Sequence, residues 1–117
     1  MHFGEFSFGS IRIDGVTYEH DVVIDRGEVH RRKKNPSKKF REDYGHTPLS
    51  IEEKIPWKGC RRLVIGTGET GGLYVMEGVR KEARRRGVSL VILPTAEAVE
   101  ELRKDQRRTN AVLHITC

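Results

Sequence analysis

A glycine-rich segment between residues 66 and 72 is the first feature of the chain that could do chemistry. It reads Gly66-Thr67-Gly68-Glu69-Thr70-Gly71-Gly72 and fits the G-x-G-x-x-G pattern, between an apolar run suited to a strand and a segment with helical spacing. In that context, glycines let backbone amides and the positive end of a helix approach a phosphate or a carboxylate. One hypothesis is therefore an anion or nucleotide site that is formed by Gly66, Thr67, Gly68, Gly71 and Gly72.

Departures from the nucleotide-binding pattern favour a purely structural interpretation of this segment. Glu69 places a negative charge inside the expected anion cradle, and no Lys-Ser or Lys-Thr pair ends the motif as it does in a P-loop. The next expected strand ends in Leu93-Pro94-Thr95, without the acidic residue that holds a ribose. On this interpretation, the glycines only allow a sharp turn from a strand into a closely packed helix.

A basic segment between Arg26 and Arg41 is the second candidate. It carries a net charge of +7, whereas the whole chain carries +5, so the positive excess is local. Such a patch can neutralise phosphates or attract acidic partners. Only Phe40 and Tyr44 are aromatic nearby, which makes nucleic acid binding a weaker interpretation than a solvated loop. The expected patch residues are Arg31, Arg32, Lys33, Lys34, Lys38 and Lys39.

The other reactive residue types form no recognisable site. The five histidines lack metal-ligand spacing, so we expect neither a metal nor a cofactor. His114 falls in an apolar run, where a hydrogen-bonded structural histidine is expected. Cys60 lies near Lys58, Arg61 and Arg62, which would lower the pKa of a thiol, but it has no identifiable base partner. The same is true of the hydroxyl residues Ser37, Ser50, Thr67 and Thr70.

The elements that must position these residues begin with two hairpins. Apolar and polar residues alternate from Phe6 to Tyr18 across Asp14-Gly15, a pattern typical of two strands joined by a tight turn. A second pair of strands, at Val22–Ile24 and Glu28–Arg31, flanks another turn. These hairpins are expected either to extend a larger sheet or to cover its open face.

The middle of the chain predicts little regular structure. The polar composition of residues 32–45 indicates a long exposed loop. Ser50 and Glu53 have the spacing of a capping box, which predicts a short helix that Pro56 ends.

Strands and helices alternate in the second half. Continuous apolar runs predict strands that are covered on both faces, and apolar residues at helical spacing predict the helices between them. The expected elements are a strand at Leu63–Ile65, a helix over 75–86, a strand at Leu90–Leu93, a helix over 95–106 and a strand at Ala111–Ile115. This β-α-β-α-β order makes at least the first two strands parallel. We therefore expect residues 1–117 to form one three-layer α/β domain around a central mixed sheet.

The direction of the last strand decides where the two cysteines lie. If the last strand runs antiparallel beside Leu63–Ile65, Cys60 and Cys117 lie at the same end of the sheet and can pair. If it runs parallel, they lie at opposite ends.

Composition narrows the class of protein. No apolar run approaches the roughly 18 residues of a membrane span, and the first residues lack the order of a signal peptide, so we expect a cytoplasmic protein. A third of the residues are charged, whereas Gln occurs once and Asn and Met twice each. This depletion of thermolabile residues beside many ionisable ones indicates a thermophilic source.

Several short segments, spread over almost the whole chain, form a distinctive combination. These segments are Phe6-x-Phe8-Gly9-Ser10, Gly15-x-x-Tyr18, Asp21–Ile24, Arg31–Lys34, Gly45-His46, Leu63–Gly68, Leu93-Pro94-Thr95-x-x-Ala98 and Leu113–Cys117. Together they resemble the Mth-type domain family, a group of small archaeal, bacterial and eukaryotic domains. The resemblance implies a three-layer α/β fold with a central mixed sheet. Relatives include an adipogenesis-associated protein and a mitochondrial complex I assembly factor, which implies an interaction or assembly role; no catalytic residues carry over.

These observations lead to three functional hypotheses. The first is a non-enzymatic domain that binds another protein or assists assembly, with self-association through an apolar patch left open. The alternative is a domain, or a minor enzyme, that holds an anionic ligand or nucleotide at residues 66–72. The weakest is nucleic acid binding through residues 31–39.

Overall fold

The three amino-terminal strands form a small sheet of their own in the computed structural model, which describes residues 1–117. β1 (Phe3–Ser7), β2 (Ser10–Ile13) and β3 (Val16–Tyr18) pair antiparallel in that order. Asp14 and Gly15 connect β2 to β3 with φ of 50° and 79°, the conformation that a two-residue hairpin turn requires. The hairpin predicted across Asp14-Gly15 is therefore confirmed.

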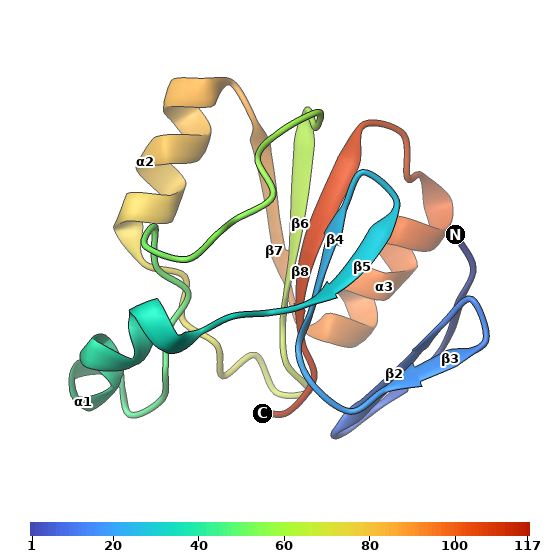
Figure 1. Cartoon of the computed structure of the whole chain (residues 1–117), viewed down its shortest axis with the longest axis horizontal. Helices are drawn as coiled ribbons and strands as arrows, with labels where there is room; N and C mark the ends of the chain where they lie inside the picture. The colour runs from blue at the N-terminus through green and yellow to red at the C-terminus, as the bar shows by residue number, and fades with distance from the viewer.

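The second sheet has five strands and is mixed, as predicted (Figure 1). Its strand order is β5-β4-β8-β6-β7. β6 pairs parallel with both β7 and β8, whereas β4 pairs antiparallel with β5 and β8. The second hairpin therefore extends the central sheet. The strands are β4 (Val22–Asp25), β5 (Glu28–Arg31), β6 (Arg62–Thr67), β7 (Ser89–Leu93) and β8 (Thr109–His114).

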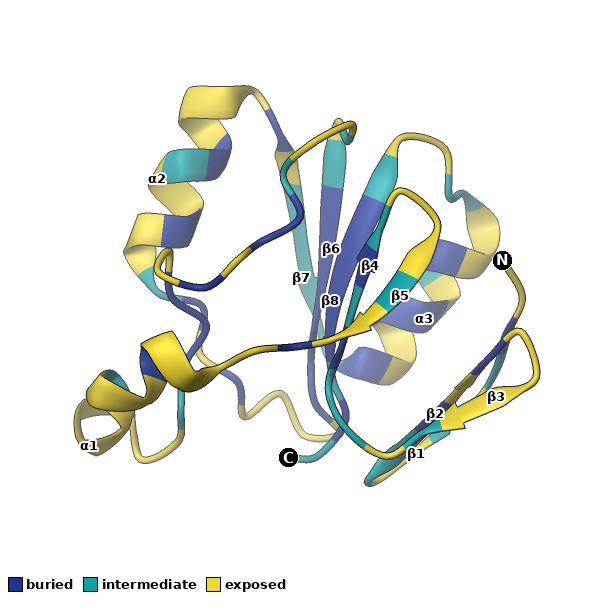
Figure 2. Ribbon diagram, in the orientation of Figure 1, coloured by how far each residue is buried: buried dark blue, intermediate teal, exposed yellow.

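Two helices cover opposite faces of the central sheet and produce the three layers (Figure 1). α2 (Glu77–Arg86) buries Val79 and Ala83 on one face, and Gly87 ends it with φ of 68°. α3 (Thr95–Lys104) buries Val99 and Leu102 on the other face. Because neighbouring strand residues point to opposite faces, β6 and β8 contribute to both cores and are almost entirely buried (Figure 2).

The small sheet lies on the same face as α3. Phe3, Ile11 and Ile13 from β1 and β2 are buried in one cluster with Val99 and Leu102 of α3. The amino-terminal strands therefore cover the sheet, while β4 and β5 extend it. Both expected arrangements of the early hairpins occur.

The prediction of a long exposed loop over residues 32–45 is wrong at two points. Residues Asn35–Phe40 form the 3-10 helix η1, and Arg41–Tyr44 form the short helix α1. Arg32 and Ser37 are buried, because both side chains bond to carboxylate and hydroxyl groups from other segments. The lysines of this segment stay exposed, as expected (Figure 2).

The capping-box helix predicted at Ser50 does not form. Residues 51–53 make an isolated turn, although the Glu52 amide does donate to Ser50 Oγ at 3.3 Å. The Glu53 carboxylate bonds to Arg32 and Ser37 instead of reaching back to the Ser50 amide. The Glu53 side chain, which a capping box needs, therefore makes tertiary contacts instead.

Candidate functional site

The glycine-rich segment holds the chain's own last residues. The amides of Glu69 and Gly72 donate to the carbonyl oxygens of Thr116 and Cys117 at 2.7 and 2.6 Å. A Cβ added at Gly68 or Gly72 would lie 2.5 Å from Cys117 backbone atoms. Glycine is required here because two backbone segments approach each other closely. This contact accounts structurally for Gly68 and Gly72, while anion binding at residues 66–72 stays a prediction.

The helix predicted directly after the glycines begins later. Residues 73–76 come first, and Val75 makes a parallel bridge to Leu49 before α2 starts at Glu77. The positive end of α2 is therefore not joined directly to the turn. The Gly68 amide donates to Thr95 Oγ1 at 2.8 Å, and Thr67 Oγ1 donates to the Leu93 carbonyl at 3.1 Å.

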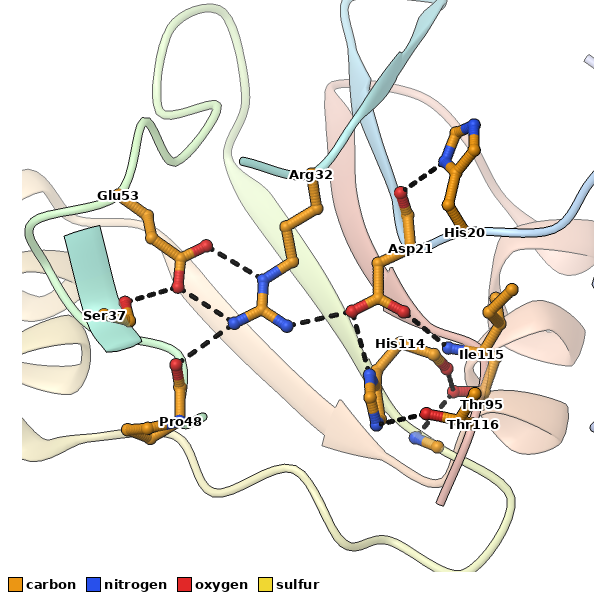
Figure 3. Close-up of polar contacts among 11 residues, drawn as sticks. His20, Asp21, Arg32, Ser37, Pro48, Glu53, Thr95, His114, Ile115 and Thr116 are labelled. Carbon is orange, nitrogen blue, oxygen red and sulfur yellow. Dashed lines mark hydrogen bonds and ion pairs between the residues drawn. The ribbon is translucent and has the colours of Figure 1, made fainter. Parts of the chain in front are cut away.

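A buried ion cluster centred on Arg32 connects four segments of the chain (Figure 3). Arg32 donates to both Glu53 carboxylate oxygens and to Asp21 Oδ2, each at 2.9 Å, and to the Pro48 carbonyl at 3.1 Å. The Arg32 and Glu53 side chains are 2% and 3% exposed. Ser37 Oγ adds a hydrogen bond to Glu53 Oε2 at 2.5 Å. Every charged group in this cluster thus has hydrogen-bonded partners.

Arg32 and Asp21 keep their charges at neutral pH. Burial by itself lowers the pKa of Arg32, but the hydrogen bonds and charges of Glu53 and Asp21 raise it above its ordinary value. Burial by itself raises the pKa of Asp21. The hydrogen bond and charge of His114, the Ile115 amide and the charge of Arg32 outweigh that effect and lower the Asp21 pKa to about 2. Asp21 is therefore an ionised acceptor.

Asp21 also orients His114 at the end of β8 (Figure 3). Asp21 Oδ2 lies 2.8 Å from His114 Nδ1, and Asp21 Oδ1 accepts from the Ile115 amide at 3.0 Å. His114 Nε2 lies 3.2 Å from Thr116 Oγ1. The expectation of a hydrogen-bonded histidine at position 114 is confirmed.

An open cavity of about 680 Å³, which we call the basic cleft, lies beside this cluster. Only one of its lining residues is hydrophobic, and both His114 and Thr116 line it. A second cavity of about 260 Å³ shares Arg32, Lys34, Lys38, His114 and Thr116 with it. None of the cleft's surface cations forms an ion pair within the chain. These cations are Arg31, Lys33, Lys34, Lys38 and Lys54.

The structure divides the predicted basic patch. Arg31, Lys33, Lys34 and Lys38 line the basic cleft with exposed side chains. Arg32 was expected on the surface, but it is buried in the ion cluster, because Glu53 and Asp21 neutralise it there. Lys39 does not line the cleft, and its Nζ lies 2.7 Å from Glu52 Oε1.

Sequence reasoning missed Asp21, Glu53, Lys54 and Thr116. Asp21 precedes β4, and the register of β4 on β8 pairs Val22 with Leu113, which places Asp21 beside His114. The available signal was an acidic residue directly before a buried strand. This signal identifies Asp21 as a partner of His114 only once the pairing of β4 with β8 is known.

The cysteines do not form a second site. β8 is parallel to β6, so Cys60 and Cys117 lie at opposite ends of the sheet, and both are free. Burial raises the pKa of the Cys60 thiol, which contradicts the lowering expected from neighbouring cations. No group of three or more His, Cys, Asp or Glu residues is arranged to hold a metal ion. No helix has the length and apolar character needed to cross a bilayer.

Comparison with known proteins places the chain in a family. The model of the family described as "Protein of unknown function (DUF498/DUF598)" matches residues 3–114. A conserved hypothetical protein from Pyrococcus horikoshii OT3 is 30% identical, with a TM-score of 0.86 and full coverage of both chains. A protein named MT938 is 29% identical, with a TM-score of 0.73 and coverage of 98% of this chain and 97% of that one.

A more distant structure has the same fold. A Mth938-like domain from Bordetella pertussis is 18% identical, with a TM-score of 0.60 and coverage of 97% of this chain and 84% of that chain. The resemblance to the Mth-type domains and the predicted α/β fold are both confirmed. The chain belongs to the DUF498/DUF598 family of proteins of unknown function, with the fold of the Mth938-like domains.

Proposed function

We propose that this domain binds a small anionic ligand in the basic cleft. The observation that carries the proposal is the set of unpaired cations: Arg31, Lys33, Lys34, Lys38 and Lys54 line one cavity without carboxylate partners. Of the carboxylates in the cleft, Asp21 is already bound by Arg32 and His114, which leaves Glu19 as the only free one. The cleft therefore has a local positive charge that an anion can neutralise.

The size and lining of the cleft favour a small, highly charged ligand. A volume of about 680 Å³ is in the range of small-molecule sites. Only one lining residue is hydrophobic and five are unpaired cations, which suits phosphate or carboxylate groups better than an apolar molecule. No Phe, Tyr or Trp lines the cleft, so it lacks the large aromatic rings on which the bases of a nucleic acid strand commonly stack. This favours a small ligand over nucleic acid.

Calorimetric titration with inorganic pyrophosphate tests the proposal. We expect saturable binding that weakens at least tenfold when Lys33, Lys34, Lys38 and Lys54 are replaced by Gln. A matched control removes the same charge elsewhere, by replacing Arg80, Lys81, Lys104 and Arg108 with Gln; these cations are exposed and form no ion pair. Equal loss of binding in both variants would mean that only net charge attracts the anion, and the proposal would be wrong.

Amide chemical shifts distinguish the basic cleft from the glycine-rich segment. Binding in the cleft should shift Lys34, Lys38 and Thr116. Shifts confined to residues 66–72 would instead place the anion at the originally predicted site and overturn the assignment to the cleft.

We infer a second, separate role in protein interaction from an exposed aromatic pair. The Tyr44 and Tyr74 rings stack with centroids 4.7 Å apart and an angle of 16° between their planes. The two residues are 39% and 49% exposed. Stacked surface aromatics are typical of interfaces. This supports the interaction or assembly role that the family resemblance implies, which we expect in the cytoplasm.

A second copy of the chain is the simplest partner for this surface. Sedimentation should give a dimer for the wild-type chain and a monomer for Tyr44→Ser/Tyr74→Ser. A wild-type monomer at high concentration would exclude self-association through the aromatic pair.

A further inference from the structure

Three side chains beside the basic cleft are arranged like a nucleophile, a base and an orienting acid. Thr116 Oγ1 lies 3.2 Å from His114 Nε2, and His114 Nδ1 lies 2.8 Å from Asp21 Oδ2. The first distance is at the long end of the range for a nucleophile and its base. The arrangement corresponds in roles to a hydroxyl–imidazole–carboxylate triad.

The hydrogen bonds around Asp21 fix the direction of proton donation. Asp21 accepts from the Arg32 guanidinium at 2.9 Å and from the Ile115 amide at 3.0 Å, so it is held as a carboxylate. The neutral imidazole must then carry its proton on Nδ1 to donate to Asp21. Nε2 is left as an acceptor, and the Thr116 hydroxyl donates to it. In this arrangement, His114 Nε2 can take the proton of the Thr116 hydroxyl when that hydroxyl attacks a substrate.

The pair of reactive groups lies where a ligand can reach it. Both His114 and Thr116 line the basic cleft and also the adjoining smaller cavity. Lys34 and Lys38 line the same two cavities. Their ammonium groups can stabilise the negative charge that develops on a carbonyl oxygen under attack.

We propose that Thr116, His114 and Asp21 hydrolyse carboxylic esters whose acyl part carries a negatively charged group, such as a free carboxylate. This inference rests on the proposed function, because the cations of the basic cleft are what select an anionic acyl group. Thr116 and His114 are the catalytic residues, and Asp21 is a positioning residue that Arg32 holds in place.

The reaction balances without any cofactor. Thr116 Oγ1 attacks the ester carbonyl carbon while its proton passes to His114 Nε2. The tetrahedral intermediate expels the alcohol, which takes that proton, and an acyl-threonine remains. Water then attacks the acyl carbon with His114 as the base. The released carboxylic acid loses its proton to the solvent, and Thr116 regains its hydroxyl proton from His114.

Release of para-nitrophenol from para-nitrophenyl succinate by the full chain tests this proposal. We expect turnover with kcat/KM higher than for the neutral para-nitrophenyl acetate. Thr116→Ala and His114→Asn should each lower kcat/KM for the succinate ester by about 100-fold or more, the scale of general-base catalysis. Thr116→Ser should retain activity, because it keeps the hydroxyl.

Three further variants separate the roles. Cys117→Ser should retain full activity, because the thiol takes no part. Lys34→Gln/Lys38→Gln should lower kcat/KM for the anionic ester more than for the neutral ester. Asp21→Asn should lower kcat more than it changes KM, since the carboxylate orients the base without touching the substrate.

The outcomes distinguish the catalytic inference from the proposed binding of an anion in the basic cleft. Pyrophosphate binding without ester turnover would overturn the catalytic inference and leave the proposed function standing. Turnover that survives Thr116→Ala, or that is lost in Cys117→Ser, would also overturn it. Absence of both binding and turnover would refute both proposals. Thermal unfolding of each variant, followed by circular dichroism, ensures that a lost activity is not a lost fold.

Discussion

Replacing Arg32 with methionine tests whether the buried ion cluster holds the middle of the chain in place. Methionine keeps much of the side-chain volume but removes hydrogen bonds to Glu53, Asp21 and Pro48. Glu53, whose side chain is 3% exposed, then keeps only the Ser37 hydroxyl as a hydrogen-bond donor. Asp21 still has His114 and the Ile115 amide, so most of the cost arises at Glu53.

The loss in free energy of unfolding that we expect for Arg32→Met is large for a domain of this size. Removing one partner of a buried ion pair costs about 3–5 kcal/mol, because the other charge stays buried without compensation. Native domains have a free energy of unfolding of about 5–15 kcal/mol, so Arg32→Met should remove about a fifth of the total or more. The corresponding fall in Tm is about 10–20 °C.

Urea unfolding at neutral pH, followed by circular dichroism, measures this loss. Lys33→Met is the matched control, since Lys33 is the next residue, is exposed and forms no ion pair. The double variant Arg32→Met/Glu53→Leu removes both buried charges, and we expect it to be more stable than Arg32→Met alone. A loss below about 1 kcal/mol for Arg32→Met, or a double variant no more stable than the single one, would refute the reasoning.

Three other predictions concern stability. Gly68→Ala should destabilise the fold more than Gly87→Ala in urea unfolding: both glycines have positive φ, but only at Gly68 does a Cβ meet backbone atoms, at 2.5 Å. The pKa of Asp21 is lowered from 3.8 to about 2 on folding, so its contribution of about 2 kcal/mol is present above pH 4 and lost as the pH falls toward 2. The stability difference between the wild-type chain and Asp21→Asn should therefore shrink over that interval. The composition predicts a Tm above about 65 °C by calorimetry, and a lower value would exclude heat adaptation.

Local pattern was sufficient to predict most of the fold. Alternation across Asp14-Gly15 marked the first hairpin, and apolar runs at helical or strand spacing marked β6, α2, β7, α3 and β8. These signals depend on neighbours within a few residues, which is why they are readable in one sequence. The capping box at Ser50 and Glu53 was a local signal that failed, because Arg32 and Ser37 bind the Glu53 carboxylate.

The candidate site depended on contacts between distant residues. Asp21 and His114 are 93 positions apart and meet only because β4 pairs antiparallel with β8. The sequence by itself determined the early hairpins, the order of strands and helices from β6 to β8, and the positive charge of the segment from Arg26 to Arg41. Only the tertiary structure decided that Arg32 is buried, that the glycine-rich segment holds residues 116 and 117, and that Arg31, Lys33, Lys34 and Lys38 line one cleft. These features depend on which strands pair and on which distant charges neutralise each other. Neither produces a pattern among residues that are close in the sequence.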